Sequence, residues 1–227
     1  MAEGVQHTVP RGRGRPRVPL ERIVAAALAI VDDGGPQALT MRALANRLST
    51  GLAVLYRAVS GRAELVGLVV DDVLGRADFE VLEGIAQTGE TKEWEDICRS
   101  AALSLYDSLA AHPGVAALLT EYIPTGPNAL AVREGVLRLL LNVGFTPAEA
   151  ARAYATVSRM VIGFAAQLHA ESGTDPLLTQ GFFAGLDPLV FPATRSASEV
   201  LARMRLDDEF RYALDLFLAG LSAERSR

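Results

Sequence analysis

A short segment of the sequence decides the fold: residues 39–57 have the sequence LTMRALANRLSTGLAVLYR. Thr40 is a typical helix N-cap, and apolar residues recur after it at helical spacing, which predicts a short helix over 41–48. Ser49-Thr50-Gly51 predicts a tight turn, followed by a second short helix over 52–57. Two short helices joined by such a turn suggest a helix-turn-helix, whose second helix enters the DNA major groove.

The flanking sequence extends this helical pattern in both directions. Apolar spacing predicts a helix from Leu20 that ends at Gly34-Gly35-Pro36, and a fourth helix from Gly61 to about Val81. Residues 82–91 form a break, and 173–195 are expected to be irregular or partly helical. Further helices are expected over 93–111, 114–121, 128–143, 147–170 and 196–204, and from 207 onward.

No segment predicts a strand, so the expected fold class is all-α. We expect a disordered basic tail over residues 1–18, a three-helix DNA-binding head over 19–66, and a larger helical domain over 67–227 that binds a ligand and dimerises.

The charge distribution favours a nucleic-acid partner for the head. The chain has 227 residues and a net charge of −5, yet residues 1–62 hold nine arginines against four acidic residues. Residues 63–227 hold 13 basic residues against 23 acidic ones. A basic head on an acidic body suggests that the head meets a polyanion.

Several other classes of protein are disfavoured. The basic residues before the apolar run 23–31 resemble a signal peptide, but Asp32-Asp33-Gly34-Gly35 follows and no apolar stretch approaches the roughly 18 residues of a membrane span. With one cysteine, Cys98, which we interpret as a core residue, no disulfide within the chain is possible. We therefore expect a cytoplasmic protein with no membrane partner.

An enzyme is not expected. The chain has three histidines and one cysteine, and no glycine-rich phosphate loop follows a strand. We predict no catalytic residues, no cofactor and no metal site.

The segment 39–48, continued by Leu55-Tyr56-Arg57 and Arg62-Ala63-Glu64-Leu65, is similar to the head of the tetracycline-repressor (TetR) family. The resemblance implies that Tyr56 and Arg62 contact phosphate, the latter at the start of the fourth helix, and that Arg42 reaches a base or a phosphate. The alternatives are a purely buried Tyr56 and a solvated Arg42. The full set of expected DNA contacts outside the tail is Thr40, Arg42, Ser49, Thr50, Leu52, Ala53, Tyr56, Arg57 and Arg62.

The recognition helix departs from the family pattern. Leu52, Ala53 and Val54 have few hydrogen-bonding groups and can touch only thymine methyl groups, so direct readout there is weak. Arg57 stands where the family often has an aromatic residue, and it could reach a phosphate or a guanine.

The N-terminal tail offers a second DNA contact. Its Arg-Gly-Arg-Pro core resembles an AT-hook, and an extended Arg-Gly-Arg unit fits a narrow A·T-rich minor groove. We predict that Arg13 and Arg15 insert there; the alternative is a generic basic tail.

The C-terminal part resembles the tetracycline-repressor branch itself, through Trp94-x-Asp96, Ala111-His112, residues 144–147 and residues 158–163. In that branch a histidine at the end of the long helix helps to bind the drug's magnesium, and His112 occupies this place; a plain helix C-cap is the alternative. Gln167, Ala101 and Leu105 replace the polar and aromatic groups of the branch, which indicates a largely apolar inducer and no magnesium.

The expected ligand-binding wall combines apolar residues with two polar anchors. Arg159 and Gln167 lie two turns apart on one predicted helix and are expected to orient the ligand. For each wall residue, ordinary core packing is the alternative. The wall comprises Leu105, Leu109, His112, Tyr122, Leu139, Arg159, Gly163, Phe164 and Gln167.

Two helices, over 151–168 and from 207 onward, are apolar on more than one side, so they should be buried all round. By resemblance they pair with their copies in a homodimer, which places two heads on a palindromic operator. The expected function is a repressor that a small-molecule inducer releases from this DNA, with the fourth helix as the lever between pocket and head. The alternatives are an architectural protein that binds A·T-rich minor grooves, or an activator or ligand carrier of the same fold.

Overall fold

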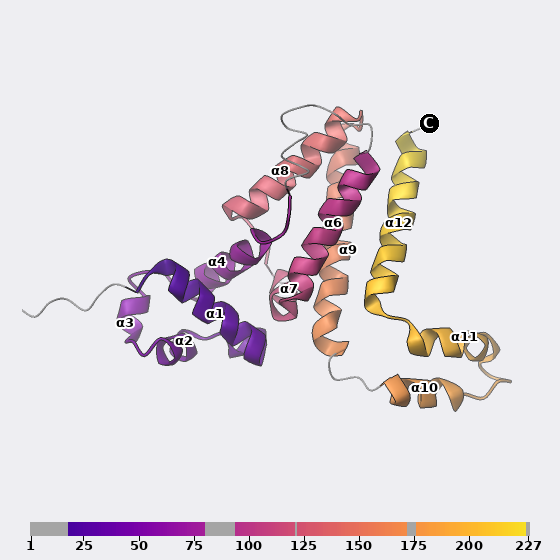
Figure 1. Ribbon diagram of the computed structural model, residues 1–227, viewed down its shortest axis with the longest axis horizontal. Helices are drawn as coiled ribbons and strands as arrows, with labels where there is room; N and C mark the ends of the chain where they lie inside the picture. Colours follow the sequence, from indigo (N-terminus) through magenta and orange to yellow (C-terminus); the bar gives the residue numbers. More distant parts are fainter. Residues whose placement is uncertain (1–17, 80–93, 121, 172–175, 226–227) are drawn as a thin grey trace, which may run out of the picture.

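The computed structural model describes residues 18–79, 94–120, 122–171 and 176–225, and within these ranges the regular secondary structure is helical, with no strand (Figure 1). The predicted all-α class is confirmed. The head contains α1 (Leu20–Gly34), a 3-10 turn (Pro36–Ala38), α2 (Met41–Arg47), α3 (Leu52–Leu55) and α4 (Arg62–Leu74). The body contains α6 (Trp94–Ala110), α7 (Pro113–Leu119), α8 (Pro127–Asn142), α9 (Pro147–Glu171), α10 (Pro176–Ala184), α11 (Pro192–Arg203) and α12 (Leu206–Arg225).

The short helices of the head form where the sequence predicts them. Thr40 caps α2, and its side-chain oxygen accepts a hydrogen bond from the Ala43 amide at 3.1 Å. The turn after α2 contains Ser49 in a left-handed conformation, with φ of 51°. α3 is shorter than predicted, because it ends at Leu55 instead of Arg57. Leu55 is fully buried against the other head helices and fixes α3 in place.

α4 also ends earlier than predicted, at Leu74 instead of about Val81. Gly75 ends the helix, and its amide donates to the carbonyl of Asp71 at 2.9 Å. The apolar face of α4 includes Leu65, Val69 and Val73, which are fully buried. The expected domain boundary between residues 66 and 67 falls within α4, so this one helix belongs to both the head and the joint with the body.

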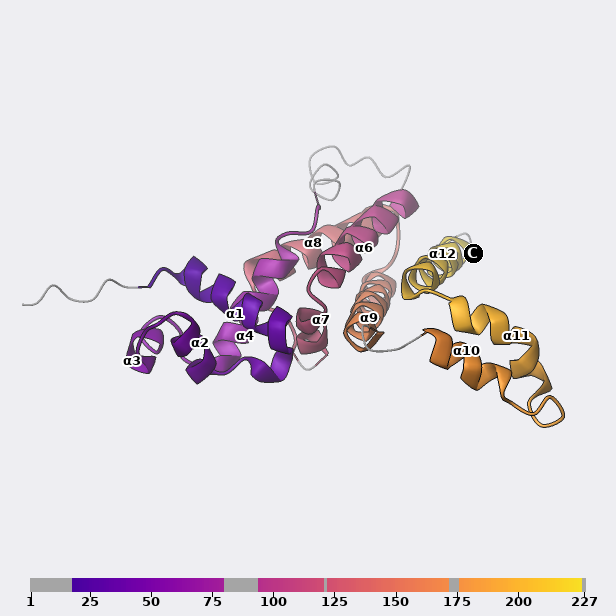
Figure 2. The same ribbon diagram turned by 60° about the horizontal axis from the view of Figure 1, so that its bottom comes forward.

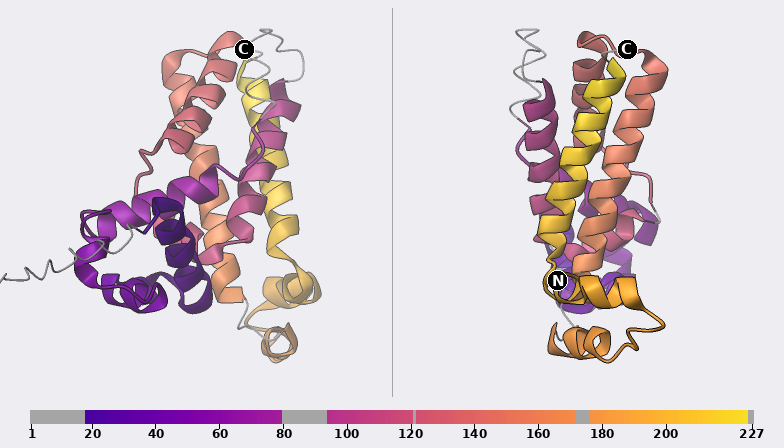
Figure 3. Two further views of the ribbon diagram at one scale, coloured as in Figure 1. Left: turned by 60° about the vertical axis from the view of Figure 1, so that its left-hand side comes forward. Right: turned by 90° about the vertical axis from the view of Figure 1, so that its right-hand side faces the viewer.

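The body is built on the long helix α9, which contacts α6, α7, α8 and α12. Figures 1 and 3 show α9 and α12 running side by side along the body. α9 begins with a capping box: the Thr146 amide donates to the Glu149 carboxylate at 2.8 Å, and Thr146 Oγ1 accepts from the Glu149 amide at 3.4 Å. Pro147 occupies the first turn, as predicted.

An aromatic cluster fixes α12 to the body. The Phe210 ring is fully buried, stacks on Tyr106 of α6 with ring centroids 4.2 Å apart, and lies 5.7 Å from the ring of Phe164 of α9. Beside this cluster, Tyr106 Oη donates a hydrogen bond of 2.7 Å to Asp207 in the first turn of α12. Arg205 contacts the second oxygen of the same carboxylate at 3.1 Å.

The hydrogen bond from Tyr106 and the contact with Arg205 hold the pKa of Asp207 below its ordinary value. A carboxylate with a depressed folded-state pKa stabilises the fold above its unfolded pKa of about 3.9, and this contribution is lost as the pH falls through the folded value. We expect the melting temperature of Asp207→Asn to lie below that of the wild type at pH 6 and to approach it at pH 3. Thermal unfolding at both pH values measures this difference. The exposed neighbour variant Asp208→Asn is the control, and an equal pH profile for both variants would refute the prediction.

α10 and α11 pack on each other and extend from the side of the body that faces away from the head (Figure 2). The range 173–195, expected to be irregular or partly helical, is partly helical, because α10 lies within it; α11 begins at Pro192 instead of Ser196. Proline suits the first turn of a helix, which explains this earlier start. Large apolar side chains on this pair remain exposed, among them Leu189 at 91% and Phe182 at 65%.

Candidate DNA-binding head and ligand cavity

The head presents the predicted recognition helix to solvent. Leu52 and Ala53 are exposed at the start of α3, and the Tyr56 ring, directly after α3, is 53% exposed. A purely buried Tyr56 is therefore excluded. Ser49 is exposed and Thr50 half-buried in the preceding turn, so the turn and α3 form one continuous outer surface.

The arginines of the head are engaged differently. Arg42 and Arg57 are exposed and form no hydrogen bond or ion pair within the described part of the chain, whereas Arg47 forms an ion pair with Asp33 at 2.7 Å. Arg62 donates to the carbonyl of Leu39 at 2.8 Å and to that of Pro36 at 3.0 Å, so it ties α4 to the segment between α1 and α2. Its phosphate contact, like that of Arg42, stays a prediction. Arg13 and Arg15 lie outside the described residues.

An apolar cavity lies inside the body, between four helices. The space between its lining atoms totals about 540 Å³, and part of this space is open solvent at the mouth of the cavity. α6, α8, α9 and α12 each contribute side chains, and Phe79 adds one from the segment after α4. The lining residues are Phe79, Cys98, Ala101, Ala102, Leu105, Val132, Val136, Leu140, Ala153, Tyr154, Val157, Ser158, Val161, Phe217, Leu218 and Leu221.

Few polar groups reach this cavity. Tyr154 and Ser158 supply hydroxyls, and Tyr154 Oη accepts from Arg133 Nε at 3.3 Å. Burial raises the pKa of the Cys98 thiol to about 12, so it remains an uncharged thiol at neutral pH. An apolar cavity with two hydroxyls suits a largely apolar small molecule with few hydrogen-bonding groups.

The predicted wall residues are divided among several places. Leu105 lines the cavity, whereas Leu109 and Leu139 are fully buried core residues and Phe164 packs on Phe210. Gln167 is exposed, and its amide donates to the carbonyl of Gly163 in its own helix at 3.1 Å.

A separate shallow groove gathers three of the predicted residues, Tyr122, Arg159 and Gly163, together with Leu119, Thr120, Ile123 and Ile162. Arg159 is exposed there, and it donates to the carbonyl of Ala155 of its own helix at 3.3 Å. Arg159 and Gln167 therefore do not line the main cavity. Their role in orienting a ligand stays a prediction.

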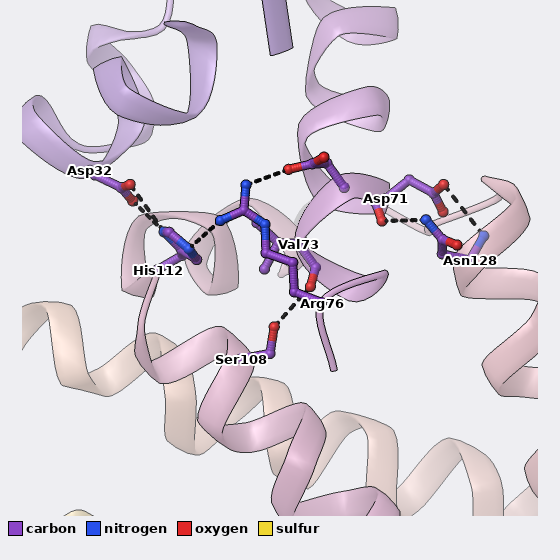
Figure 4. Close-up of polar contacts among 8 residues, drawn as sticks. Asp32, Asp71, Val73, Arg76, Ser108, His112 and Asn128 are labelled. Carbon is purple, nitrogen blue, oxygen red and sulfur yellow. Dashed lines mark hydrogen bonds and ion pairs between the residues drawn. The ribbon is translucent and has the colours of Figure 1, made fainter. Parts of the chain in front are cut away.

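His112 lies at the joint between head and body (Figure 4). Its Nδ1 is 3.0 Å from Asp32 of α1, and its Nε2 is 3.0 Å from a guanidinium nitrogen of Arg76, which also pairs with Asp72 at 2.6 Å. A guanidinium only donates, so Nε2 accepts, and Nδ1–H donates to Asp32. His112 is thus part of a polar bridge, and it precedes α7 as its N-cap residue instead of capping the end of α6.

Two further contacts join α4 to the body. Ser108 of α6 donates to the carbonyl of Val73 at 2.8 Å. Asp71 is the one buried charged or polar residue among those described, and it accepts hydrogen bonds from the first turn of α8, at 3.0 Å from the Ala129 amide and 3.4 Å from that of Asn128. Figure 4 shows Asp71 and Asn128 facing each other across this contact.

Two features of the site were not predicted from the sequence, namely Asp71 and the wall formed by α8. The signal for Asp71 was an acid within the apolar run 65–74, which needs a buried partner. The signal for the α8 wall was the i, i+4, i+8 spacing of Val132, Val136 and Leu140, which places them on one helix face.

Two negative findings apply to the described ranges alone. In these ranges no three or more His, Cys, Asp or Glu side chains are grouped so that they could hold a metal ion. None of the helices found there combines the length and apolar character needed to cross a membrane.

Comparisons with known proteins agree with this architecture. Residues 87–225 match the model of the tetracyclin repressor-like, C-terminal domain. The chain is 35% identical over 153 residues to an HTH-type transcriptional regulator of Saccharopolyspora erythraea, an alignment that covers 67% of this chain and 62% of that relative. It is 30% identical over 218 residues to the HTH-type transcriptional repressor DrrR1 of Streptomyces coeruleorubidus, which covers 91% of this chain and 78% of the relative.

A solved structure extends the similarity to three dimensions. The TetR family protein ActR of Streptomyces coelicolor, in complex with actinorhodin, superposes with a TM-score of 0.80 at 28% identity, over 92% of this chain and 99% of that one. A family match over more than half of the chain, with relatives at 30% identity or above, establishes the family. The chain therefore belongs to the tetracycline-repressor family of transcriptional regulators, which are DNA-binding proteins and not enzymes.

Proposed function

We propose that the protein is a ligand-responsive transcriptional repressor that binds a palindromic operator as a homodimer and is released by a largely apolar small molecule. The apolar cavity among α6, α8, α9 and α12 carries this proposal, because its lining is almost entirely apolar and two of its walls, α6 and α8, pack against α4 of the head. The ActR relative, whose solved structure contains actinorhodin, supports a small-molecule ligand.

The DNA-binding surface of the proposal is α3 with the turn before it. Leu52, Ala53 and Tyr56 are exposed there, with Arg57 beside them, and Arg42 is exposed on α2. Ser49, Thr50, Thr40 and Arg62 complete the proposed set, the last two with side chains that also hold the head together. Arg13 and Arg15 add minor-groove contacts from the tail. In this proposal the chain is divided into a tail over 1–18, a DNA-binding head over 19–66 and a ligand-binding and dimerising body over 67–227.

The proposed dimer interface is formed by α9 and α12. On α12 a row of exposed residues at helical spacing begins with Tyr212 and Leu216, which are 66% and 57% exposed, and continues through Gly220 and Ala223. Large apolar side chains followed by small residues on an exposed face are typical of a surface that another helix covers. α9 runs beside α12 and exposes Thr156 and Gln167.

Induction in this proposal follows from linkage between two sites. A ligand that binds more tightly to the form with displaced heads weakens DNA binding by the same factor. α4 is the proposed lever, since it starts in the head at Arg62 and ends at the polar bridge of His112 and Arg76.

A footprint of the purified protein on the DNA upstream of its own gene, repeated at rising salt, tests the proposal. Protection of a short two-fold symmetric site supports a dimeric regulator. Diffuse, salt-sensitive coating of A·T-rich DNA would instead favour an architectural minor-groove protein. A symmetric site at which the bound protein increases transcription would identify an activator of the same fold.

The exposed Arg57 allows a quantitative test of the interface. If each protomer places Arg57 on one phosphate, Arg57→Ala removes two phosphate contacts per dimer, and the slope of log K against log salt falls by about 0.9 for each contact. Fluorescence anisotropy with the footprinted site at several salt concentrations measures this slope. Arg138→Ala, which removes the same charge from α8 in the body, is the control. An unchanged slope for Arg57→Ala would place its side chain away from the DNA backbone.

A further inference from the structure

Asp71 is buried but has no positively charged partner. The residue is 8% exposed, and no arginine, lysine or histidine in the described part of the chain forms an ion pair with its carboxylate. The amides of Asn128 and Ala129 compensate its charge, because the first turn of a helix carries free N–H groups and the positive end of the helix dipole. α4 thus supplies the capping group of α8 from 57 residues away in the sequence.

The start of α8 is shaped to receive this carboxylate. The N-cap residue of α8 is Gly126, which has no side chain of its own for capping. A Cβ atom on Gly126 would overlap the side chain of Asp71, so any other residue here would displace that carboxylate from its position. A further hydrogen bond joins the two helices: the side-chain amide of Asn128 in α8 donates to the backbone carbonyl of Asp71 in α4 at 3.0 Å.

The same helix forms one wall of the apolar cavity. Val132, Val136 and Leu140 lie on one face of α8 and line the cavity, and the first of them is one turn beyond the capped amides. Asp71 therefore contacts the helix that an occupant of the cavity would touch. A displacement of that wall moves the N–H groups that hold Asp71.

We propose that Asp71 is a positioning residue that transmits occupancy of the cavity from α8 to α4. The inference rests on the proposed function, because it takes the cavity as the ligand site and the head as the DNA-binding surface. When the wall of α8 moves, Asp71 and α4 move with it, because a desolvated carboxylate cannot be left without its N–H partners. The position of α4 sets the position of the head, so operator affinity falls.

The second bridge at the joint is less suited to this role. This bridge runs from Asp32 of α1 through His112 to Arg76, and none of these three residues belongs to α8 or lines the apolar cavity. The contact of Asp71 joins α4 directly to a wall of the cavity, which makes it the more direct connection between cavity and head.

A double-mutant cycle on the full-length protein tests the proposal without an identified ligand. Val136→Phe places a larger side chain from α8 in the cavity, and this side chain takes the place of a bound ligand. In the wild-type background it is expected to weaken binding to the footprinted DNA by about tenfold, a typical allosteric coupling. In the Asp71→Asn background, which keeps the shape but removes the charge, the same substitution is expected to change affinity by less than about twofold. Asp72→Asn, on the same helix with an exposed partner, is the matched control and keeps the tenfold effect.

Hydrogen exchange of peptides covering α4 gives a second readout that needs no DNA. Val136→Phe is expected to speed exchange in α4 at least threefold in the wild-type and Asp72→Asn backgrounds but not in Asp71→Asn, each compared with its own parent. Hydrogen exchange distinguishes a failure of the proposed function from a failure of the coupling through Asp71. If the protein binds no symmetric DNA site but shows this exchange pattern, the proposed function is refuted and the coupling is retained.

Several results would overturn the proposal. One is a Val136→Phe effect that persists unchanged in Asp71→Asn, by either readout; another is a Val136→Phe variant that alters neither α4 exchange nor DNA affinity. If Asp71→Asn fails to fold by circular dichroism, Gly126→Ala replaces it, since a Cβ at this position displaces the Asp71 carboxylate from the N–H groups of α8. A loss of coupling in that variant supports the proposal, and full coupling contradicts it.

Discussion

Replacing Phe210 with alanine is expected to lower the free energy of unfolding by about 3–5 kcal/mol, the usual cost of truncating a buried phenylalanine. Phe210 is fully buried between Tyr106 of α6 and Phe164 of α9. Its removal leaves a cavity at the junction of three helices and takes away a stacked ring pair whose energy adds to that of apolar burial. For a chain of this size, the melting temperature should fall by roughly 6–20 °C.

Chemical denaturation followed by circular dichroism measures this loss. Tyr56→Ala is the control, because the Tyr56 ring is 53% exposed on the head and its truncation should cost less than about 1 kcal/mol. A loss below 1 kcal/mol for Phe210→Ala would mean that α12 is held to the body by other contacts. The ion pair between Arg99 and Asp215 is then the next contact to test.

The anchor at Phe210 also matters for the cavity. Phe217, Leu218 and Leu221 line the cavity from the same helix, two to three turns beyond Phe210. A looser α12 would move one wall of the cavity as well as the proposed dimer surface. The stability of the fold, the shape of the cavity and the proposed dimer surface therefore all depend on one buried ring.

Local patterns in the sequence were sufficient for the elements of the head. Thr40 caps α2 as expected, and Leu44, one of the regularly spaced apolar residues of the helix predicted over 41–48, is fully buried. Local signals gave less accurate helix ends, because Gly75 ends α4 well before the predicted residue. A glycine within a helical pattern can continue or end a helix, and only tertiary packing decides which.

The candidate site was harder to predict because its contacts join distant parts of the chain. Arg159 and Gln167 share a helix, but their spacing did not show that this face of α9 lies outside the main cavity. Asp71 meets the first turn of α8 only after α4 and α8 have packed together. Periodicity identifies the buried face of each helix, whereas it does not identify which other helix covers that face.

Leu216→Arg is expected to convert the protein from a dimer to a monomer and to lower operator affinity by at least a hundredfold. Leu216 is 57% exposed on α12, so the substitution leaves the core of the protomer intact, but it buries a charge in the proposed interface. A monomer can place only one head on a palindromic site and loses the effective concentration that links the second head to the first, which is worth factors of about 10²–10⁴.

Sedimentation equilibrium and anisotropy on the footprinted DNA measure the two effects together. Leu141→Arg, at an exposed leucine on α8, is the matched control and should remain dimeric with unchanged affinity. A dimeric Leu216→Arg would place the interface away from this face of α12. A monomeric variant that retains full affinity would show that one head suffices for DNA binding, which would contradict a palindromic operator. Because a dimer holds its two heads at the spacing of the two half-sites, we expect the loss of dimer and the loss of affinity to occur together.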